Sequence, residues 1–171
     1  MSIDVEQDRR RAFVLAMSHT ASAVTVVTTD GPAGRFGTTI SAMTPVSADA
    51  DKPSLLICIN RASTTAKPIL LNRQFCVNVL SDTQQSIADC FAGRHGSRDP
   101  DFKFACANWV HQPQGSPRLV GALASFDCRL LDEKLVGTHH VIFGQVEELI
   151  SNPGKKALLY SRQRYGCFNA L

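Results

Sequence analysis

The sequence predicts a mainly β protein, an antiparallel barrel that carries a few helices, and three observations support this fold class. Segments with the composition of strands outnumber helical ones, and turn residues separate them. Strands and helices do not alternate as a doubly wound α/β sheet requires. The chain also lacks a GxGxxG segment, which argues against a Rossmann dinucleotide site.

The first third of the chain predicts a helix, a hairpin and a buried strand. Residues 3–19 are helical, with Asp4 and Gln7 as a capping box and an apolar face that packs on a sheet. A β-branched run and an Asp-Gly turn open a hairpin over 23–47. Residues 54–60 are almost continuously apolar, which predicts a strand buried on both faces.

The rest of the chain predicts short helices and further strands. Pro68 fits only the first turn of a helix, so a helix begins near Thr65 or Ala66. The remaining predicted elements are a strand over 75–80, a helix over 83–92, an irregular region over 93–122, long strands over 123–133 and 139–150, and a helical turn or strand over 155–160.

Length, composition and charge favour one globular domain that spans residues 1–171. Apolar residues make up 44% of the chain and charged residues 19%, a balance that allows one buried core. The net charge of +3 is spread along the chain. This charge suits a small phosphate-bearing ligand and predicts no nucleic-acid partner.

The six cysteines form no CxxC pair, so the sequence predicts neither a zinc site nor a redox dithiol. Several lie in apolar strand-like runs, where a reduced cysteine packs as a small hydrophobe. The charged N-terminus carries no signal-type apolar stretch, and no run is long enough to cross a membrane. We therefore expect a cytoplasmic, reducing location and no membrane partner.

The second strand of the predicted hairpin is rich in small and hydroxyl-bearing residues. Such residues let a planar ligand approach the backbone, whose N–H and C=O groups then bond to the ligand edge. An ordinary exposed strand explains the same composition, because Thr favours β structure. The residues concerned are Gly37, Thr38, Thr39, Ser41 and Ala42.

A second group of residues follows the apolar strand, where the chain passes into a helix. Cys58, Ile59 and Asn60 end the strand, and Ser63 and Thr65 stand at the helix start. Free N–H groups at a helix start suit a phosphate, although simple N-capping explains the same residues. With the Thr-rich strand beside it, this group fits a flavin ring on one strand and its phosphate at the helix.

Short segments spread from about residue 10 to 165 occur in the order of a known family. They are 25–31, 37–42, 53–60, 63–65, 75–80, 91–93, 103–104, 115–119, 121–124 and 158–160. The chain resembles the flavin reductase-like split-barrel family, the short reductase components of two-component flavin-dependent monooxygenases. The resemblance implies a Greek-key split β-barrel (an FMN-binding split barrel) with a few flanking helices, and a homodimer. It also implies reduction of FMN or FAD by NADH or NADPH, with reduced flavin passed to a separate monooxygenase.

The resemblance also assigns roles to individual residues. The flavin ring is held by the Thr-rich strand, its ribityl side by the end of the apolar strand and its phosphate by the helix start. These residues are Thr38, Thr39, Ser41 and Ala42 for the ring, Cys58, Ile59 and Asn60 beside it, and Ser63 and Thr65 for the phosphate. Phe91 and Ala92 lie near the flavin tail or the nicotinamide. Apart from the resemblance, Tyr165 is predicted to bind the cofactor, with Tyr165 and Trp109 each interpreted as either a lid or part of the core.

His139 is the one residue predicted to take part in catalysis. It matches the family histidine near the pyridine nucleotide. Thr138 replaces the acid that often precedes this histidine, so no carboxylate is available there to influence the imidazole. A hydrogen-bonded core histidine is the competing interpretation. His139 and His140 point to opposite faces of a strand, which makes them a poor chelating pair, and no metal is predicted.

Two classes of function remain at this point. The first is an enzyme, an NAD(P)H:flavin oxidoreductase that releases reduced flavin. The second is a non-enzymatic flavin-binding module, an electron carrier or redox-responsive barrel that retains its flavin. Hydride transfer between two cofactors needs mainly their stacking, so no acid–base side chain is expected to be essential.

Overall fold

The fold is built on one antiparallel sheet whose strand order is β3-β2-β6-β9-β10-β5-β4. The structure, a computed structural model, describes residues 2–49, 51–97, 99–111 and 115–170. The strands of this sheet are β2 (Thr25–Thr29), β3 (Phe36–Ile40), β4 (Met43–Ser47), β5 (Ser54–Asn60), β6 (Gln74–Val79), β9 (Ala124–Val136) and β10 (His139–Ser151). The predicted mainly β class is confirmed.

The sheet curls because its two edge strands are consecutive in the sequence. β3 and β4 end the strand order, yet only Ser41 and Ala42 join them. A linker this short spans at most about 11 Å, so the two edges must meet at this corner. The curled, incompletely closed sheet agrees with the split barrel that the resemblance implied.

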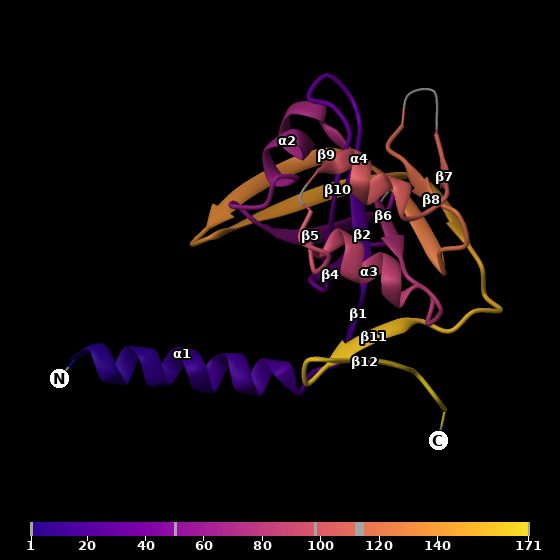
Figure 1. Ribbon diagram of the computed structural model, residues 1–171. Helices are drawn as coiled ribbons and strands as arrows, with labels where there is room; N and C mark the ends of the chain where they lie inside the picture. The colour runs from indigo at the N-terminus through magenta and orange to yellow at the C-terminus, as the bar shows by residue number, and fades with distance from the viewer. Residues whose placement is uncertain (1, 50, 98, 112–114, 171) are drawn as a thin grey trace.

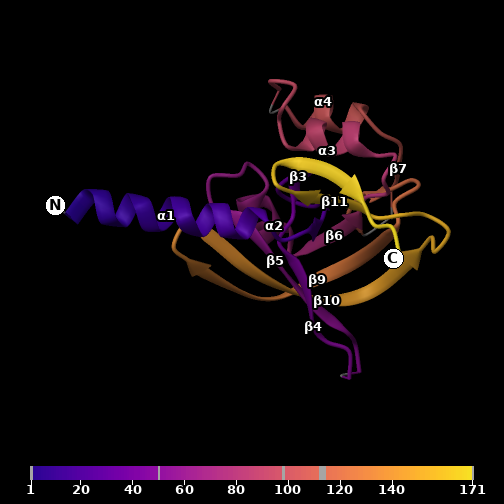
Figure 2. The ribbon, with the colours of Figure 1, turned by 90° about the horizontal axis from the view of Figure 1, so that it is seen from below.

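Smaller elements surround the sheet (Figures 1 and 2). A three-stranded sheet has the order β1-β11-β12, and β7 pairs with β8. Their bounds are β1 (Ser22–Ala23), β7 (Trp109–Val110), β8 (Arg118–Leu119), β11 (Leu158–Ser161) and β12 (Arg164–Cys167), and the short helices are α2 (Ala66–Asn72), α3 (Gln85–Phe91) and α4 (Pro100–Ala105).

Two hydrophobic clusters make the core, one on each face of the sheet around β2. Neighbouring residues of a strand point to opposite faces, so Val27 enters one cluster and Val26 the other. The first cluster includes Ile57, Ile69, Phe75 and Ile142, and the second includes Leu80, Phe91, Phe104 and Leu158. Asn78 on β6 is fully buried beside β2, and its amide donates to the carbonyl of Val26 over 3.1 Å.

The first helix, α1 (Ser2–Ser18), forms as predicted but does not pack on the sheet. It extends away from the body of the molecule in both views (Figures 1 and 2). Phe13 is 66% exposed and Leu15 is 63% exposed. The two clusters already cover the sheet around β2, so no face is left for α1 there. The predicted capping box is also wrong, because the helix begins before Asp4.

Two strand predictions are wrong in detail. The predicted second strand of the hairpin breaks at Ser41, and its second half, β4, pairs with β5 instead of β2. The strand at 54–60 alternates between buried and half-buried residues, so only one of its faces is fully buried. The two long strands are confirmed, with Gly137 in their turn at a φ of +58°.

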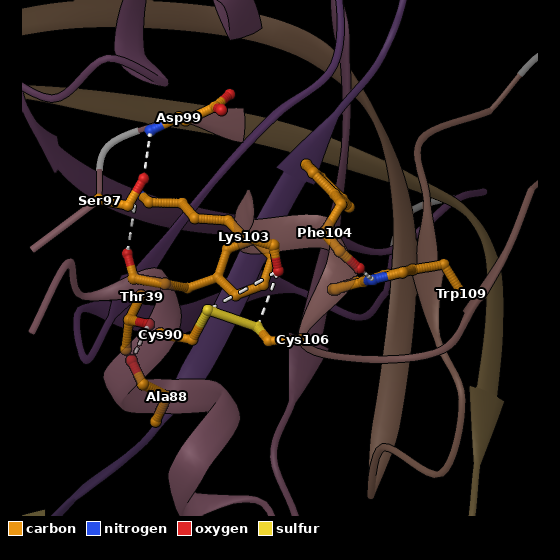
Figure 3. Close-up of a disulfide and its surroundings, with 10 residues drawn as sticks. Thr39, Ala88, Cys90, Ser97, Asp99, Lys103, Phe104, Cys106 and Trp109 are labelled. Atoms are coloured by element: carbon orange, nitrogen blue, oxygen red, sulfur yellow. Dashed lines mark hydrogen bonds between the residues drawn. A yellow bond between two sulfur atoms is a disulfide. The ribbon is translucent and has the colours of Figure 1, made fainter. Parts of the chain in front are cut away.

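The region predicted to be irregular contains a helix, α4, that begins at Asp99-Pro100. The carboxylate of Asp99 accepts a hydrogen bond from the Asp101 N–H over 3.1 Å, and Pro100 fills the first helical turn. The helix places Cys106 against α3, and Cys90 and Cys106 form a disulfide (Figure 3). This disulfide was not predicted from the sequence, in which no CxxC pair occurs and several cysteines were interpreted as reduced.

The remaining predictions concern the ends of the elements and the membrane. Residues 158–161 form a strand, β11, which decides between the two predicted alternatives for that segment. α2 begins at Ala66 with Thr65 before it, as Pro68 predicted. Within the described ranges, no helix has both the length and the apolar character needed to span a membrane.

Candidate functional site

A cavity of about 360 Å³ lies where the β3–β4 corner meets the ends of β5 and β10. This volume falls within the usual range for small-molecule sites. The curled sheet provides one part of the wall, and the segment after α3, the turn before α2 and the small three-stranded sheet provide most of the rest. The lining residues are Val24, Thr38, Thr39, Ile40, Ser41, Ala42, Cys58, Ile59, Asn60, Ser63, Ala92, Arg94, His139, Tyr160 and Tyr165.

Backbone hydrogen bonds fix the sheet side of the cavity. The Cys58 N–H donates to the Ala42 carbonyl over 3.0 Å, which joins the corner to β5. Two residues further along β5, Asn60 pairs with His139 of β10. Residues from three distant parts of the sequence are thus held together by the sheet itself, before any side chain contributes.

Thr39 ties the sheet to α3. Its hydroxyl donates to the Ala88 carbonyl over 2.7 Å, so the helix is anchored beside the cavity, and Ala92 just after the helix reaches the wall. β3 is an edge strand whose described partner is β2 alone. Backbone groups on its other side are therefore directed away from the sheet, where the edge of a planar ligand can meet them.

His139 lies on the wall at an exposed position, and its Nδ1 is 3.0 Å from the hydroxyl of Thr138. Thr138 therefore does contact the imidazole, through a neutral group. His140 points elsewhere and contacts Glu133. No cluster of three or more His, Cys, Asp or Glu suited to a metal ion occurs within the ranges that the structure describes.

Ser63 is on the wall, whereas Thr65 is not. The Ser63 hydroxyl accepts a hydrogen bond from the Thr65 N–H over 3.3 Å, so it contributes to the turn that leads into α2. The Thr65 hydroxyl is fully buried and has no hydrogen-bond partner in the structure. Thr65 is the N-cap residue of α2 and no described side chain caps the helix, so the capping interpretation is wrong and Ser63 only stabilises the turn before α2. Thr65 is not placed to meet a ligand in this cavity.

Phe91 is a core residue and does not line the cavity. It is 1% exposed, and its ring packs edge-on against Phe104 and Trp109, with ring centroids 5.3 and 5.4 Å away. Trp109 donates its indole N–H to the Phe104 carbonyl over 3.0 Å, so it too belongs to the core. Gly37 packs against the Phe91 ring, which gives its small size a structural reason other than ligand access.

Cys58 is the cysteine on the cavity wall. Partial burial raises the pKa of its thiol above the usual value. The thiol therefore stays protonated near neutral pH and is a weak nucleophile. Cys58 fits a packing role at the wall better than a redox role.

Sequence reasoning missed Arg94 and Tyr160, which line the cavity together with residues of the β-sheet. Arg94 follows the end of α3, a place interpreted only as a helix terminus. Its guanidinium lies 2.8 Å from the carboxylate of Asp89. That carboxylate also accepts a hydrogen bond from the Tyr165 hydroxyl over 2.9 Å. Burial and this hydrogen bond raise the pKa of Tyr165 to about 12.

These features fit a flat heteroaromatic ligand with an anionic tail. The corner offers small residues and free backbone edges for a ring, and Ile59 and Ala42 offer apolar contact. Ser63 and Arg94 offer donors for an anion. Tyr165 stays neutral up to strongly alkaline pH, so it adds no negative charge that would repel such a ligand.

The comparison with known families agrees with this site. The model of the flavin reductase like domain matches residues 17–168. The chain belongs to the flavin reductase-like family.

Members of this family with similar sequences and structures bear names that fit the site. The FMN reductase (NADH) RutF of Methylorubrum extorquens is 45% identical over 154 residues, which cover 90% of this chain and 73% of that protein. A homologue of nitrilotriacetate monooxygenase component B from Mycobacterium thermoresistibile has a TM-score of 0.84 at 32% identity, over 96% of this chain and 89% of that one. The NADH:FAD oxidoreductase SgcE6 of Streptomyces globisporus has a TM-score of 0.83 at 27% identity, over 94% and 93%.

Proposed function

We propose that the protein uses NADH to reduce FMN and releases the reduced flavin to a separate flavin-dependent monooxygenase. The observation that carries this proposal is the cavity at the β3–β4 corner. It gathers every site residue predicted from the sequence except Thr65 and Phe91. The named similarity to FMN reductases that use NADH supports the same reaction.

FMN and NADH are chosen over FAD and NADPH because of the names of the relatives. The Methylorubrum protein is named an FMN reductase (NADH), whereas the more distant Streptomyces protein is named for FAD. The partner oxygenase is proposed because the Mycobacterium protein is a homologue of a monooxygenase component. A homodimer and a cytoplasmic location, both expected from the sequence, complete the proposal.

Each part of the wall has a distinct task in this reaction. When bound, the flavin accepts the hydride and the nicotinamide donates it. Thr38, Ser41 and Ala42 hold the edge of the flavin ring, and Cys58, Ile59 and Asn60 line its side. His139 is at an exposed position of the wall, where it orients the pyridine nucleotide. The protein thereby brings the reacting atoms to about 3–3.5 Å without supplying an acid or a base.

Steady-state oxidation of NADH and NADPH, each with added FMN, FAD or riboflavin, tests the proposal. We expect NADH consumption that rises with FMN concentration and saturates, and a purified protein that loses its flavin on dialysis. The competing function is a flavin-binding electron carrier. A yellow cofactor that dialysis does not remove, with slow NADH oxidation that added flavin leaves unchanged, would establish the carrier and overturn the enzyme.

A further inference from the structure

Four side chains form a charged and aromatic cluster beside the cavity, called here the Arg94 cluster: Asp89, Arg94, Tyr160 and Tyr165. They come from α3, the segment after it, β11 and β12. Arg94 lies with its guanidinium carbon 5.4 Å from the Tyr165 ring centroid and 6.0 Å from that of Tyr160. The two tyrosine rings are 5.2 Å apart.

Contacts with the other side chains of the Arg94 cluster hold Arg94 in place. Asp89 does not line the cavity, yet its carboxylate binds both the guanidinium, over 2.8 Å, and the Tyr165 hydroxyl, over 2.9 Å. The Tyr160 hydroxyl accepts a weaker contact from Arg94 over 3.4 Å. A guanidinium has five N–H donors in a planar fork. These two contacts leave donors for a ligand, and the side chain is 50% exposed.

Charge points to the kind of ligand that Arg94 would bind. Along the described wall of the cavity, Arg94 is the residue with a permanent positive charge, and neither a lysine nor a second arginine is present. Both FMN and NADH carry phosphate groups, and a guanidinium binds phosphate through paired, charge-assisted hydrogen bonds. Ser63, the phosphate residue predicted from the sequence, offers a hydroxyl without charge.

We propose that Arg94 is the residue that binds a nucleotide phosphate in this cavity, with Asp89 and Tyr165 as its positioning residues. The inference rests on the proposed function and goes further, because it names the residue that distinguishes nucleotides from their phosphate-free analogues. The phosphate belongs either to FMN or to NADH. In both cases the group that binds is a phosphate ester anion, held by Arg94 beside the rings of Tyr160 and Tyr165.

Direct binding measurements test this assignment without using turnover. Flavin fluorescence gives dissociation constants for FMN and for riboflavin, and calorimetry gives those for NADH and for reduced nicotinamide riboside. The variants are Arg94→Gln, Arg94→Lys and, as a control with the same charge change, Arg164→Gln. Arg164 is exposed on β12 and does not line this cavity.

The expected result is a selective loss of affinity for one phosphate-bearing ligand. Arg94→Gln should weaken its binding about ten- to hundredfold, because a charge-assisted contact is lost. Arg94→Lys should recover part of that loss, since it keeps the charge but not the planar fork. Loss for FMN without loss for riboflavin assigns the flavin phosphate, and loss for NADH without loss for the riboside assigns the pyridine nucleotide.

Other outcomes overturn the assignment. These are equal losses for a nucleotide and its phosphate-free analogue, or a loss no larger than that of Arg164→Gln, with melting curves confirming that each variant is folded. A wild-type protein that binds FMN tightly but does not oxidise NADH would overturn the proposed enzyme and leave the Arg94 measurements intact. Normal turnover together with unchanged binding in Arg94→Gln would overturn the Arg94 role alone.

Discussion

At the scale of single residues, Gly37 shows how tightly β3 packs on α3. A Cβ at this position would lie 2.5 Å from one carbon of the Phe91 ring and 2.9 Å from the next. The Phe91 ring packs against both Phe104 and Trp109 in a three-ring cluster, so it has little room to move. The absence of a side chain at Gly37 is thus a requirement of the core beside the cavity.

We predict that Gly37→Ala lowers the free energy of unfolding by about 1–3 kcal/mol, the usual cost of overpacking a core. Denaturant titration measures the change. Gly166→Ala is the control, because a Cβ there meets no atom within 4 Å and Gly166 also lies in a strand. Equal unfolding midpoints for the two variants would show that the Phe91 contact is not restrictive.

His139 is the second residue whose role can be measured. It lines the cavity, and the neutral hydroxyl of Thr138 contacts its Nδ1 over 3.0 Å. A contact made equally in the ground and transition states affects KM and leaves kcat unchanged. If His139 orients the pyridine nucleotide, its loss should act on NADH binding rather than on the flavin.

We predict that His139→Ala raises the KM for NADH about tenfold, or roughly 1.4 kcal/mol, and leaves the flavin dissociation constant nearly unchanged. His140→Ala is the control, because His140 contacts Glu133 and does not line the cavity. Steady-state kinetics with varied NADH, alongside melting curves, separate the two roles. A lower melting temperature with unchanged kinetics would make His139 a structural residue only.

At the scale of elements, local sequence signals predicted the positions of strands and helices better than the pairing of the strands. The apolar and β-branched runs at β2, β5 and β6 were found, since their composition determines a strand without help from distant residues. The partner of β4 was not, because Ser41 and Ala42 carry no Gly or Pro to mark the break. α4 was missed although Asp99-Pro100 is a helix-start signal, because the surrounding prolines and glycines dominated the interpretation.

The disulfide joins α3 to α4 and closes a loop between residues separated by 16 positions. Cross-linking a loop of this size stabilises a protein by about 3 kcal/mol, because it restricts the unfolded chain. No spacing rule in the sequence identifies the pair, since only the fold brings α4 beside α3. The stabilisation should be confined to the oxidised protein.

We predict that Cys106→Ser lowers the free energy of unfolding of the oxidised protein by about 3 kcal/mol. Adding a thiol reductant to the wild-type protein should reproduce most of that loss and leave the variant unchanged. Cys167→Ser, at an exposed cysteine outside the pair, is the control. Wild-type stability that does not respond to reductant would mean that the bond adds nothing to the fold.

At the scale of the whole molecule, sequence reasoning located the cavity but not its full wall. Ordered family segments identified the corner, β5 and His139, which the sheet brings together. Arg94 and Tyr160 were missed because their roles depend on the packing of α3 against the C-terminal strands, which no local pattern records. Phe91 and Thr65 were placed at the site by the family resemblance, which carries over positions and not side-chain directions, whereas their side chains are buried in the interior.

The exposed apolar residues in the second half of α1 are a feature that a single chain leaves unexplained. Phe13, Val14, Leu15 and Met17 are each more than half exposed on a helix that extends from the body. Folded monomers rarely leave apolar side chains grouped in this way, and such groups mark interaction surfaces. In the proposed homodimer, a second copy of the chain would cover these exposed apolar residues of α1.

We predict that the wild-type protein is a dimer by size-exclusion chromatography with light scattering, and that Leu15→Glu is largely monomeric. A charge at this position would have to be buried in the dimer without a partner, which is strongly unfavourable. Arg9→Gln, which makes the same change in net charge at another exposed position of α1, should stay dimeric. A monomeric wild-type protein, or a Leu15→Glu variant that keeps the wild-type mass, would assign α1 to a different contact.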